Sequence, residues 1–267
     1  MLRAAYLDMD GTLLGPGGSL FRDAEGAFTM LGARALEACA RAGVEVVPYS
    51  GRRQSTLLRD ARLLGLPSYI LEAGCGLVLD GELEWLTDGL EPRDGRTIRD
   101  QIEATGAPAL LLERYGDRLR VYEPSEPVRE VSVLFLGDDI DAFAADALLV
   151  EHGLGDLRLV DNGVMPDVAG SARAYHLIPR GASKARAVAR HMQARCYAPQ
   201  DCIAVGDSRE DLAAAAVVGT FWLVANALER EPALRGALAE HANVRVADER
   251  HGAGVYEAVI TELAERR

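Results

Sequence analysis

The first and last thirds of the chain alternate short apolar runs with longer amphipathic segments. Apolar, β-branched runs that end in polar residues predict buried strands at 3–11, 44–52, 68–74, 202–207, 221–226 and 244–247. Segments with apolar residues every three to four positions predict helices at 35–43, 53–65, 183–196, 209–219 and 229–240, and after 254. Because single helices separate these strands, the pattern predicts βαβ units and a parallel sheet.

From about residue 88 to residue 179 the rhythm changes. Strands are expected at 109–115, 118–123, 130–137, 157–163 and 173–179, with helices only at 96–106 and 139–153. Adjacent strands on short turns indicate a largely antiparallel unit. The predicted fold class is therefore α/β, a Rossmann-like parallel sheet core (1–87 and 180–267) with an inserted α/β domain (88–179). A hairpin is also expected at 76–86, around Asp80-Gly81.

The charge of the chain excludes some partners. Asp and Glu number 41 against 29 Lys and Arg, a formal net charge of −12, with no basic run. This balance argues against a nucleic acid or an anionic membrane as partner. Two aspartates within the first ten residues argue against a signal peptide, and the four cysteines show no metal-binding spacing. We therefore expect a cytoplasmic enzyme or binding protein.

Polar residues gather where the predicted parallel strands end. They are Asp8 and Asp10 after the first strand, Ser50 and Gly51 after the second, Lys184 at the start of a helix, and Asp207 and Asp211 after a later strand. Taken singly, each has an ordinary explanation as a cap, a turn or a solvated side chain. Ligands of open parallel sheets bind at the carboxyl ends of the strands, so we expect these residues to surround one site.

Such a set suits phosphoryl transfer. A carboxylate can attack phosphorus and form an aspartyl-phosphate, and a second carboxylate can protonate the leaving oxygen. Mg²⁺ prefers oxygen ligands and takes only a few of them from the protein. The Asp8-Met9-Asp10 spacing fits this division of work, since alternation at a strand end lets the two side chains reach different groups.

Lys184 is the only lysine in the chain. Codon bias that replaces lysine with arginine would leave it as a chance survivor. The alternative is that this position needs a compact ammonium, which a planar guanidinium does not replace.

Four segments resemble the motifs of the haloacid dehalogenase superfamily, in order and across the chain. They read DMDGTL (8–13), SGR (50–52), GASK (181–184) and GDSRED (206–211). The insertion between the second and third motifs is similar to the large α/β cap (type IIB) of one subclass, which includes phosphatases of sugar phosphates, mannosyl-3-phosphoglycerate and sucrose phosphate, and phosphomannomutases. VANAL (224–228) and HGAGVYEAV (251–259) also look like the C-terminal half of that subclass.

The resemblance implies a role for each residue. Asp8 would be the nucleophile and Asp10 the general acid and base. Ser50, the Gly51 amide and Lys184 would bind the phosphoryl group. Mg²⁺ would be held by the group Asp8, Asp10 (through its carbonyl) and Asp207, with Asp211 in the same metal group or orienting Lys184 or a metal-bound water. Glu210 departs from the family, which usually has Asn there. A second acid at this position either tunes metal affinity or lies in solvent; we favour solvent and leave its role open.

The expected function is Mg²⁺-dependent hydrolysis of a small phosphorylated metabolite, with a sugar phosphate as the expected class by analogy. A sugar phosphomutase would use the same motifs. A non-catalytic protein that binds a phosphorylated metabolite would be expected to lack Asp8, Asp10 or Lys184. In the cap, Arg114, Arg118 and Arg120 fit either an anionic substrate or an exposed strand face.

Overall fold

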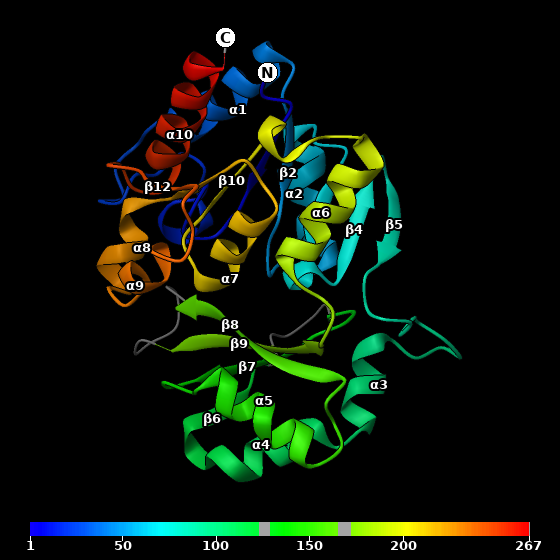
Figure 1. Cartoon of the computed structure of the whole chain (residues 1–267). Helices are drawn as coiled ribbons and strands as arrows, with labels where there is room; N and C mark the ends of the chain where they lie inside the picture. The colour runs from blue at the N-terminus through cyan, green and yellow to red at the C-terminus, as the bar shows by residue number, and fades with distance from the viewer. Residues whose placement is uncertain (123–128, 165–171, 267) are drawn as a thin grey trace.

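A computed structural model of the 267-residue chain describes residues 1–122, 129–164 and 172–266. Its central sheet has five parallel strands in the order β12-β11-β10-β1-β2 (Figure 1). The strands are β1 (Ala4–Leu7), β2 (Glu45–Pro48), β10 (Cys202–Gly206), β11 (Thr220–Leu223) and β12 (Val244–Val246). The predicted Rossmann-like core is confirmed.

Helices cover both faces of this sheet, because alternate residues of each strand point to opposite sides. Ala5 and Leu7 of β1 pack with α1 (Leu31–Ala42), α2 (Gln54–Leu64) and α10 (His251–Glu265). Ala4 and Tyr6 pack on the other face with α6 (Lys184–Arg195), α7 (Arg209–Leu212), α8 (Ala225–Arg230) and α9 (Leu234–Leu238). Both faces are therefore buried, and the central strands β1 and β10 are apolar throughout.

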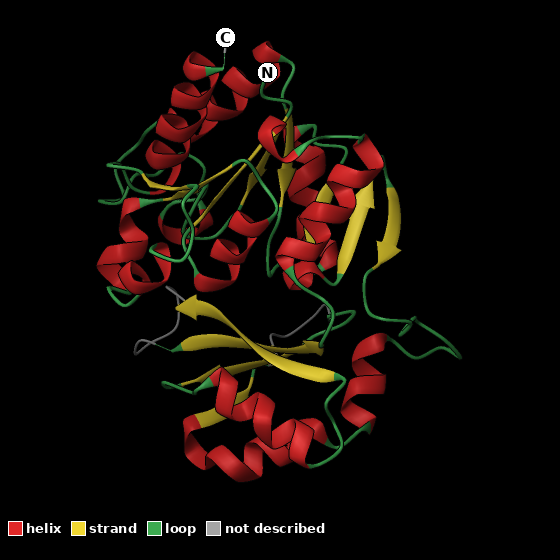
Figure 2. Ribbon diagram, viewed as in Figure 1, coloured by secondary structure: helices red, strands yellow, loops and turns green. Residues whose placement is uncertain are grey.

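The inserted cap is a four-stranded antiparallel sheet in the order β6-β7-β9-β8. Its strands are β6 (Leu119–Val121), β7 (Val133–Gly137), β8 (Leu157–Val164) and β9 (Arg173–Pro179). The helices α3 (Ile98–Ala104), α4 (Ala107–Tyr115) and α5 (Ala142–Glu151) share a separate apolar core with this sheet. The sheet lies between these helices and the parallel core (Figure 2). The boundaries at 88 and 179 stay a prediction.

The third predicted strand differs from the expectation of a parallel pairing. β3 (Tyr69–Leu71) pairs antiparallel with β4 (Gly76–Leu79), which pairs with β5 (Glu82–Trp85). A turn with φ of 45° at Glu72 and 59° at Ala73 reverses the chain directly after β3. The pairing of β3 with the parallel sheet is a single parallel bridge, Tyr49 to Ile70, beside which the Ser50 amide donates to the Ile70 carbonyl over 3.0 Å.

Other predicted elements are confirmed or corrected by local chemistry. The hairpin at Asp80-Gly81 forms, with both residues at positive φ as a two-residue turn requires. The strand predicted at 109–115 is wrong, since Pro108 near the start of α4 favours a helix and places Leu111 in the cap core. The helix predicted at 229–240 is interrupted at Pro232 and becomes α8 and α9.

Among the residues the structure describes, no helix is both long and apolar enough to span a membrane.

Candidate active site

The strand ends of the parallel sheet and the inner face of the cap enclose a cavity of about 320 Å³. Its core-side walls contain the predicted residues Asp8, Asp10, Ser50, Gly51, Lys184, Asp207 and Asp211. The glycine-rich segment after β1 also reaches this cavity, through Gly15, Gly17 and Gly18. The sequence-based expectation that these residues surround one place is therefore met, while their chemical roles stay predictions.

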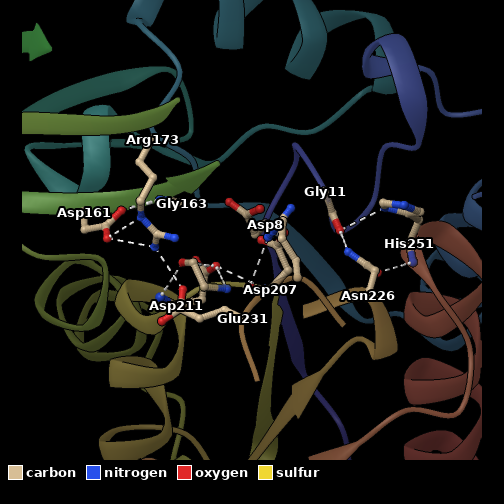
Figure 3. A network of polar contacts seen from close by, with 12 residues as sticks. Asp8, Gly11, Asp161, Gly163, Arg173, Asp207, Asp211, Asn226, Glu231 and His251 are labelled. Atoms are coloured by element: carbon tan, nitrogen blue, oxygen red, sulfur yellow. Dashed lines mark hydrogen bonds and ion pairs between the residues drawn. The ribbon is translucent and has the colours of Figure 1, made fainter. Parts of the chain in front are cut away.

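Two neighbouring strands bring Asp8 and Asp207 together. β1 pairs with β10 in parallel register, Leu7 opposite Val205, and the Asp8 amide donates to the Val205 carbonyl over 3.0 Å. A carboxylate oxygen of each lies within 4.8 Å of the other and of one from Asp211 (Figure 3). All three aspartates are buried, so their charges are poorly screened.

Lys184 neutralises part of this cluster. It is the first residue of α6, whose N-cap Ser183 accepts from the Arg186 amide. Its Nζ donates to Oδ1 of Asp8 over 2.7 Å and to Oδ1 of Asp211 over 2.6 Å, and the residue is 1% exposed. Burial alone would lower the pKa of Lys184, but the two carboxylates outweigh it and raise the pKa above its usual range.

Asp8 and Asp207 have raised pKa values. Burial is the main cause for Asp8, where Asp211 and Asp207 add to it and Lys184 opposes it. Burial likewise raises the pKa of Asp207, against the opposing charge of Arg230. Three carboxylates with two cations in contact leave the cluster with a surplus of negative charge, which favours binding of a further cation.

Asp211 is held by hydrogen bonds to both of its oxygens. Oδ1 accepts from Lys184, and Oδ2 accepts from Ser208 Oγ at 2.6 Å, Ser208 N at 3.0 Å and Asp207 N at 3.2 Å. Ser208 and Asp211 form a capping box at the start of α7. Asp211 thus fixes both the ammonium of Lys184 and the turn that carries Asp207.

The turn after β1 depends on Gly11. Its φ is 85°, and a Cβ there would collide with the Asp207 carboxylate. Its carbonyl accepts from Asn226 Nδ2 over 2.8 Å and from His251 Nδ1 over 3.0 Å (Figure 3). The two C-terminal segments singled out in the sequence therefore hold the turn that directly follows Asp10.

Asp10 lies at the rim of the cavity. Its side chain is 49% exposed, and its two oxygens accept from Nε and Nη2 of Arg52 over 2.7 and 2.5 Å. Arg52 also donates to Asp60 over 2.6 Å. The sequence contained Arg52 within its second motif, but no partner for it was predicted.

Ser50 and Gly51 meet the cap directly. Ser50 is 2% exposed, and its Oγ accepts from the Arg52 amide over 3.1 Å. The Gly51 carbonyl accepts from Nη1 of the cap residue Arg129 over 2.7 Å. A Cβ at Gly51 would lie 2.6 Å from Nδ2 of Asn162, another cap residue, so a larger residue here would displace the Asn162 side chain.

Comparison with known proteins decides the family. No family model matches the chain. A phosphoglycolate phosphatase of Halorubrum lacusprofundi is 30% identical over 252 residues, which cover 93% of this chain and 92% of that protein. The chain belongs to the haloacid dehalogenase-like phosphatases.

Solved structures support the fold of this phosphatase. The sucrose-phosphatase of Synechocystis sp., determined with sucrose and phosphate, has a TM-score of 0.69 at 17% identity over 98% of both chains. A haloacid dehalogenase-like hydrolase of Bacteroides thetaiotaomicron has a TM-score of 0.65 at 15% identity, over 98% of this chain and 99% of that one. At this level of identity the likeness concerns the architecture of core and cap.

Ion pairs between the cap and the core of the phosphatase were not foreseen. The expectation that Glu210 lies in solvent is wrong, because its side chain is 11% exposed and accepts from Arg158 of β8 over 2.9 Å. Arg173 of β9 contacts Asp161 at 2.8 Å and reaches Glu231 of the core at 2.9 Å (Figure 3). These partners lie 52 and 58 residues apart, so local sequence carries no signal for them.

The three cap arginines that the sequence offered as contacts for an anionic substrate lie on the surface instead. Arg114, Arg118 and Arg120 are exposed, and none of them lines the cavity as far as the described residues show. The cap residues that do line it are Arg129, Leu134, Asn162, Ala174 and His176. Nothing in the sequence singled these residues out from their neighbours.

The oxygens of the phosphatase site fit Mg²⁺. Asp8 Oδ2 and Asp207 Oδ1 accept no hydrogen bond from the described residues, whereas both oxygens of Asp211 are used. Carboxylate oxygens are ligands that Mg²⁺ prefers. Arg230 contacts the other oxygen of Asp207 and also bonds its carbonyl.

Proposed function

We propose that this phosphatase hydrolyses the phosphomonoester of a small metabolite, a sugar phosphate, with Mg²⁺ and through an aspartyl-phosphate on Asp8. The observation that carries the proposal is the buried ammonium of Lys184, which bridges Asp8 and Asp211 in the wall of the cavity. A cation so placed stabilises negative charge that develops on transferring phosphoryl oxygens.

The first step forms a bond from an Asp8 oxygen to phosphorus and breaks the bond from phosphorus to the ester oxygen. Lys184 holds the attacking carboxylate of Asp8 in place through its Oδ1. Ser50 and the Gly51 amide receive the phosphoryl oxygens. Asp10 must first leave Arg52 and take up a proton from solvent, and it then donates this proton to the leaving oxygen.

The second step returns the enzyme to its starting state. Water attacks phosphorus, Asp10 accepts its proton, and the bond from Asp8 to phosphorus breaks to release inorganic phosphate. Mg²⁺, held by Asp8, Asp207 and the main-chain carbonyl of Asp10, would supply positive charge to the phosphoryl oxygens. Asp211 serves as a positioning residue for Lys184 and the Asp207 turn, because its oxygens are already bonded.

The cavity volume and the names of the similar proteins support a small phosphorylated organic substrate. A phosphomutase would use the same residues, and following the product of a sugar 1-phosphate separates the two activities. Release of inorganic phosphate supports the hydrolase activity. Recovery of an isomeric sugar phosphate instead shows that the protein is a mutase.

A generic aryl phosphate provides the direct test. We expect the purified protein to hydrolyse para-nitrophenyl phosphate with Mg²⁺ and to lose this activity in EDTA, because the cluster carries a surplus of negative charge without the metal. Release of nitrophenolate is measured before and after Mg²⁺ is added back. Turnover that persists undiminished in EDTA would contradict the metal-dependent mechanism.

Replacing Arg230 should change how the protein responds to Mg²⁺. In Arg230→Gln, Asp207 loses its cation, so the metal-free protein should lose about 2 kcal/mol of stability, or about 4–8 °C in Tm. Mg²⁺ then replaces a missing charge, and it should raise the Tm more than in the wild type.

The matched control is Arg235→Gln, on the next helix, where the arginine is exposed and has no ionic partner among the described residues. Thermal unfolding with EDTA and with Mg²⁺ gives both quantities. An equal Mg²⁺ shift in Arg230→Gln and in the wild type would show that Arg230 and the metal do not share Asp207.

A further inference from the structure

The cap wall of the cavity contains a buried histidine that the mechanism does not use. His176 of β9 is 1% exposed and lines the cavity. Its Nε2 lies 3.2 Å from the position of a Cβ built on Gly51. The residue therefore stands beside the loop expected to bind the phosphoryl group.

A core carboxylate fixes the hydrogen bonds behind this histidine. Glu72, in the turn after β3, is fully buried and accepts from the amides of Glu130 and Ser132, each over 2.8 Å. It also accepts from the Ser132 hydroxyl over 2.9 Å. Because an ionised carboxylate only accepts, the proton of that hydroxyl points at Glu72.

The Ser132 hydroxyl in turn fixes the tautomer of His176. Its oxygen lies 3.0 Å from Nδ1 of His176, and its own proton is already used. Nδ1 must therefore carry the proton and donate, which leaves Nε2 as an unprotonated acceptor. Burial, with the nearby cations Arg129 and Lys184, holds the pKa of His176 well below its usual range, so the ring stays neutral.

The acceptor Nε2 has no hydrogen-bond donor among the residues that the structure describes. Beside it, the Oδ1 of Asn162 is a buried acceptor that likewise lacks a partner in the described part of the chain. The cap cation at this wall, Arg129, donates from Nη1 to the Gly51 carbonyl and lies 4.0 Å from Glu72, while its buried Nε has no partner in the described part of the chain. The wall therefore offers two acceptors, His176 Nε2 and Asn162 Oδ1, beside one donor, Arg129 Nε.

We propose that Nε2 of His176 accepts a hydrogen bond from a hydroxyl of the substrate's leaving group, so that the enzyme selects phosphate esters with a hydroxyl near the ester oxygen. This inference rests on the proposed function and specifies its substrate as a polyol or sugar phosphate. An ester with a carboxylate at that place has no proton to donate, and one with a methyl group leaves Nε2 unpaired. Both are disfavoured.

Two esters that differ in their hydroxyls test the selection. We expect the wild type with Mg²⁺ to use glycerol 1-phosphate about tenfold better than propyl phosphate in kcat/KM, mainly through KM, because the hydroxyl does not react. In His176→Phe this ratio should fall to about one, as the ring is kept without the acceptor. His152→Phe, an exposed residue of the cap outside the cavity, should keep the wild-type ratio.

A second variant and a spectroscopic measurement make the test independent of how well His176→Phe folds. Ser132→Ala keeps the imidazole but frees its tautomer, and it should lower the ratio about threefold. Histidine-selective ¹⁵N NMR should show the Nδ1-protonated form for His176 in the wild type and a mixture in Ser132→Ala.

The outcomes separate the two proposals. Hydrolysis of both esters at equal kcat/KM by the wild type, or an Nε2-protonated His176, overturns the selection and leaves the phosphatase proposal standing. Absence of turnover on these esters and on para-nitrophenyl phosphate overturns both.

Discussion

The Asp8→Asn variant should lose about 10⁴-fold or more in turnover of para-nitrophenyl phosphate, because an amide oxygen cannot form the aspartyl-phosphate. The replacement has nearly the same shape and can still accept from Lys184 through its carbonyl oxygen. The loss should therefore fall on kcat rather than on the folded state. Initial rates with Mg²⁺ at saturating substrate measure it.

The same variant should be as stable as the wild type, or more stable, in EDTA at neutral pH. Burial and the charges of Asp211 and Asp207 raise the pKa of Asp8, so its ionised form costs folding free energy at a pH above the unfolded pKa. Asparagine removes that cost. Asp117→Asn, an exposed position, should leave both activity and Tm unchanged. Full activity in Asp8→Asn would show that another group attacks phosphorus.

Removing the ammonium of Lys184 should damage both folding and catalysis. In Lys184→Met the buried carboxylates of Asp8 and Asp211 lose their shared partner, which should cost about 3–5 kcal/mol, or about 10 °C in Tm. Turnover should fall by about 10²–10³-fold, the usual effect of losing one stabilising charge at the reacting group. Thermal unfolding and kcat/KM measure the two effects.

The Lys184→Arg variant tests whether a positive charge of a different shape at this position is sufficient for stability and turnover. The guanidinium is larger than the ammonium and must fit a site where the lysine is 1% exposed, so we expect part of the stability to return while turnover stays about 10²-fold low. The control Arg186→Met lies on the same helix, where an exposed pair with Asp88 should be worth less than about 1 kcal/mol. Wild-type turnover in Lys184→Arg would favour the interpretation of Lys184 as a chance survivor.

The sequence predicted the meeting of the site residues because parallel strands carry their carboxyl ends to one edge. Asp8, Ser50 and Asp207 each follow a strand of one sheet, and their proximity follows from that topology. Helix ends at glycine could also be predicted from nearby residues alone, since Gly43, with φ of 68°, ends α1. Such features depend on residues within a few positions of one another.

What could not be predicted depends on where the cap lies on the core. Arg158 meets Glu210 and Glu72 meets Ser132 only because the two units are packed together. Arg158 and Glu210 lie 52 residues apart in the sequence. Each of them could pair with many residues of opposite charge, so the sequence alone does not identify the pair. The strand expected at 109–115 failed for a different reason: its run of leucines suits either structure, and Pro108 decided for the helix.

Because Lys184 is the only lysine in the chain, proteolysis after this residue can measure local opening of the site. A protease that cleaves after lysine finds one susceptible bond within these 267 residues, between Lys184 and Ala185 in the first turn of α6. With the ammonium buried between two aspartates, that bond becomes accessible only when the helix start leaves the sheet. The rate at which the two resulting fragments form then measures how often the start of α6 opens, without a label or a substitution.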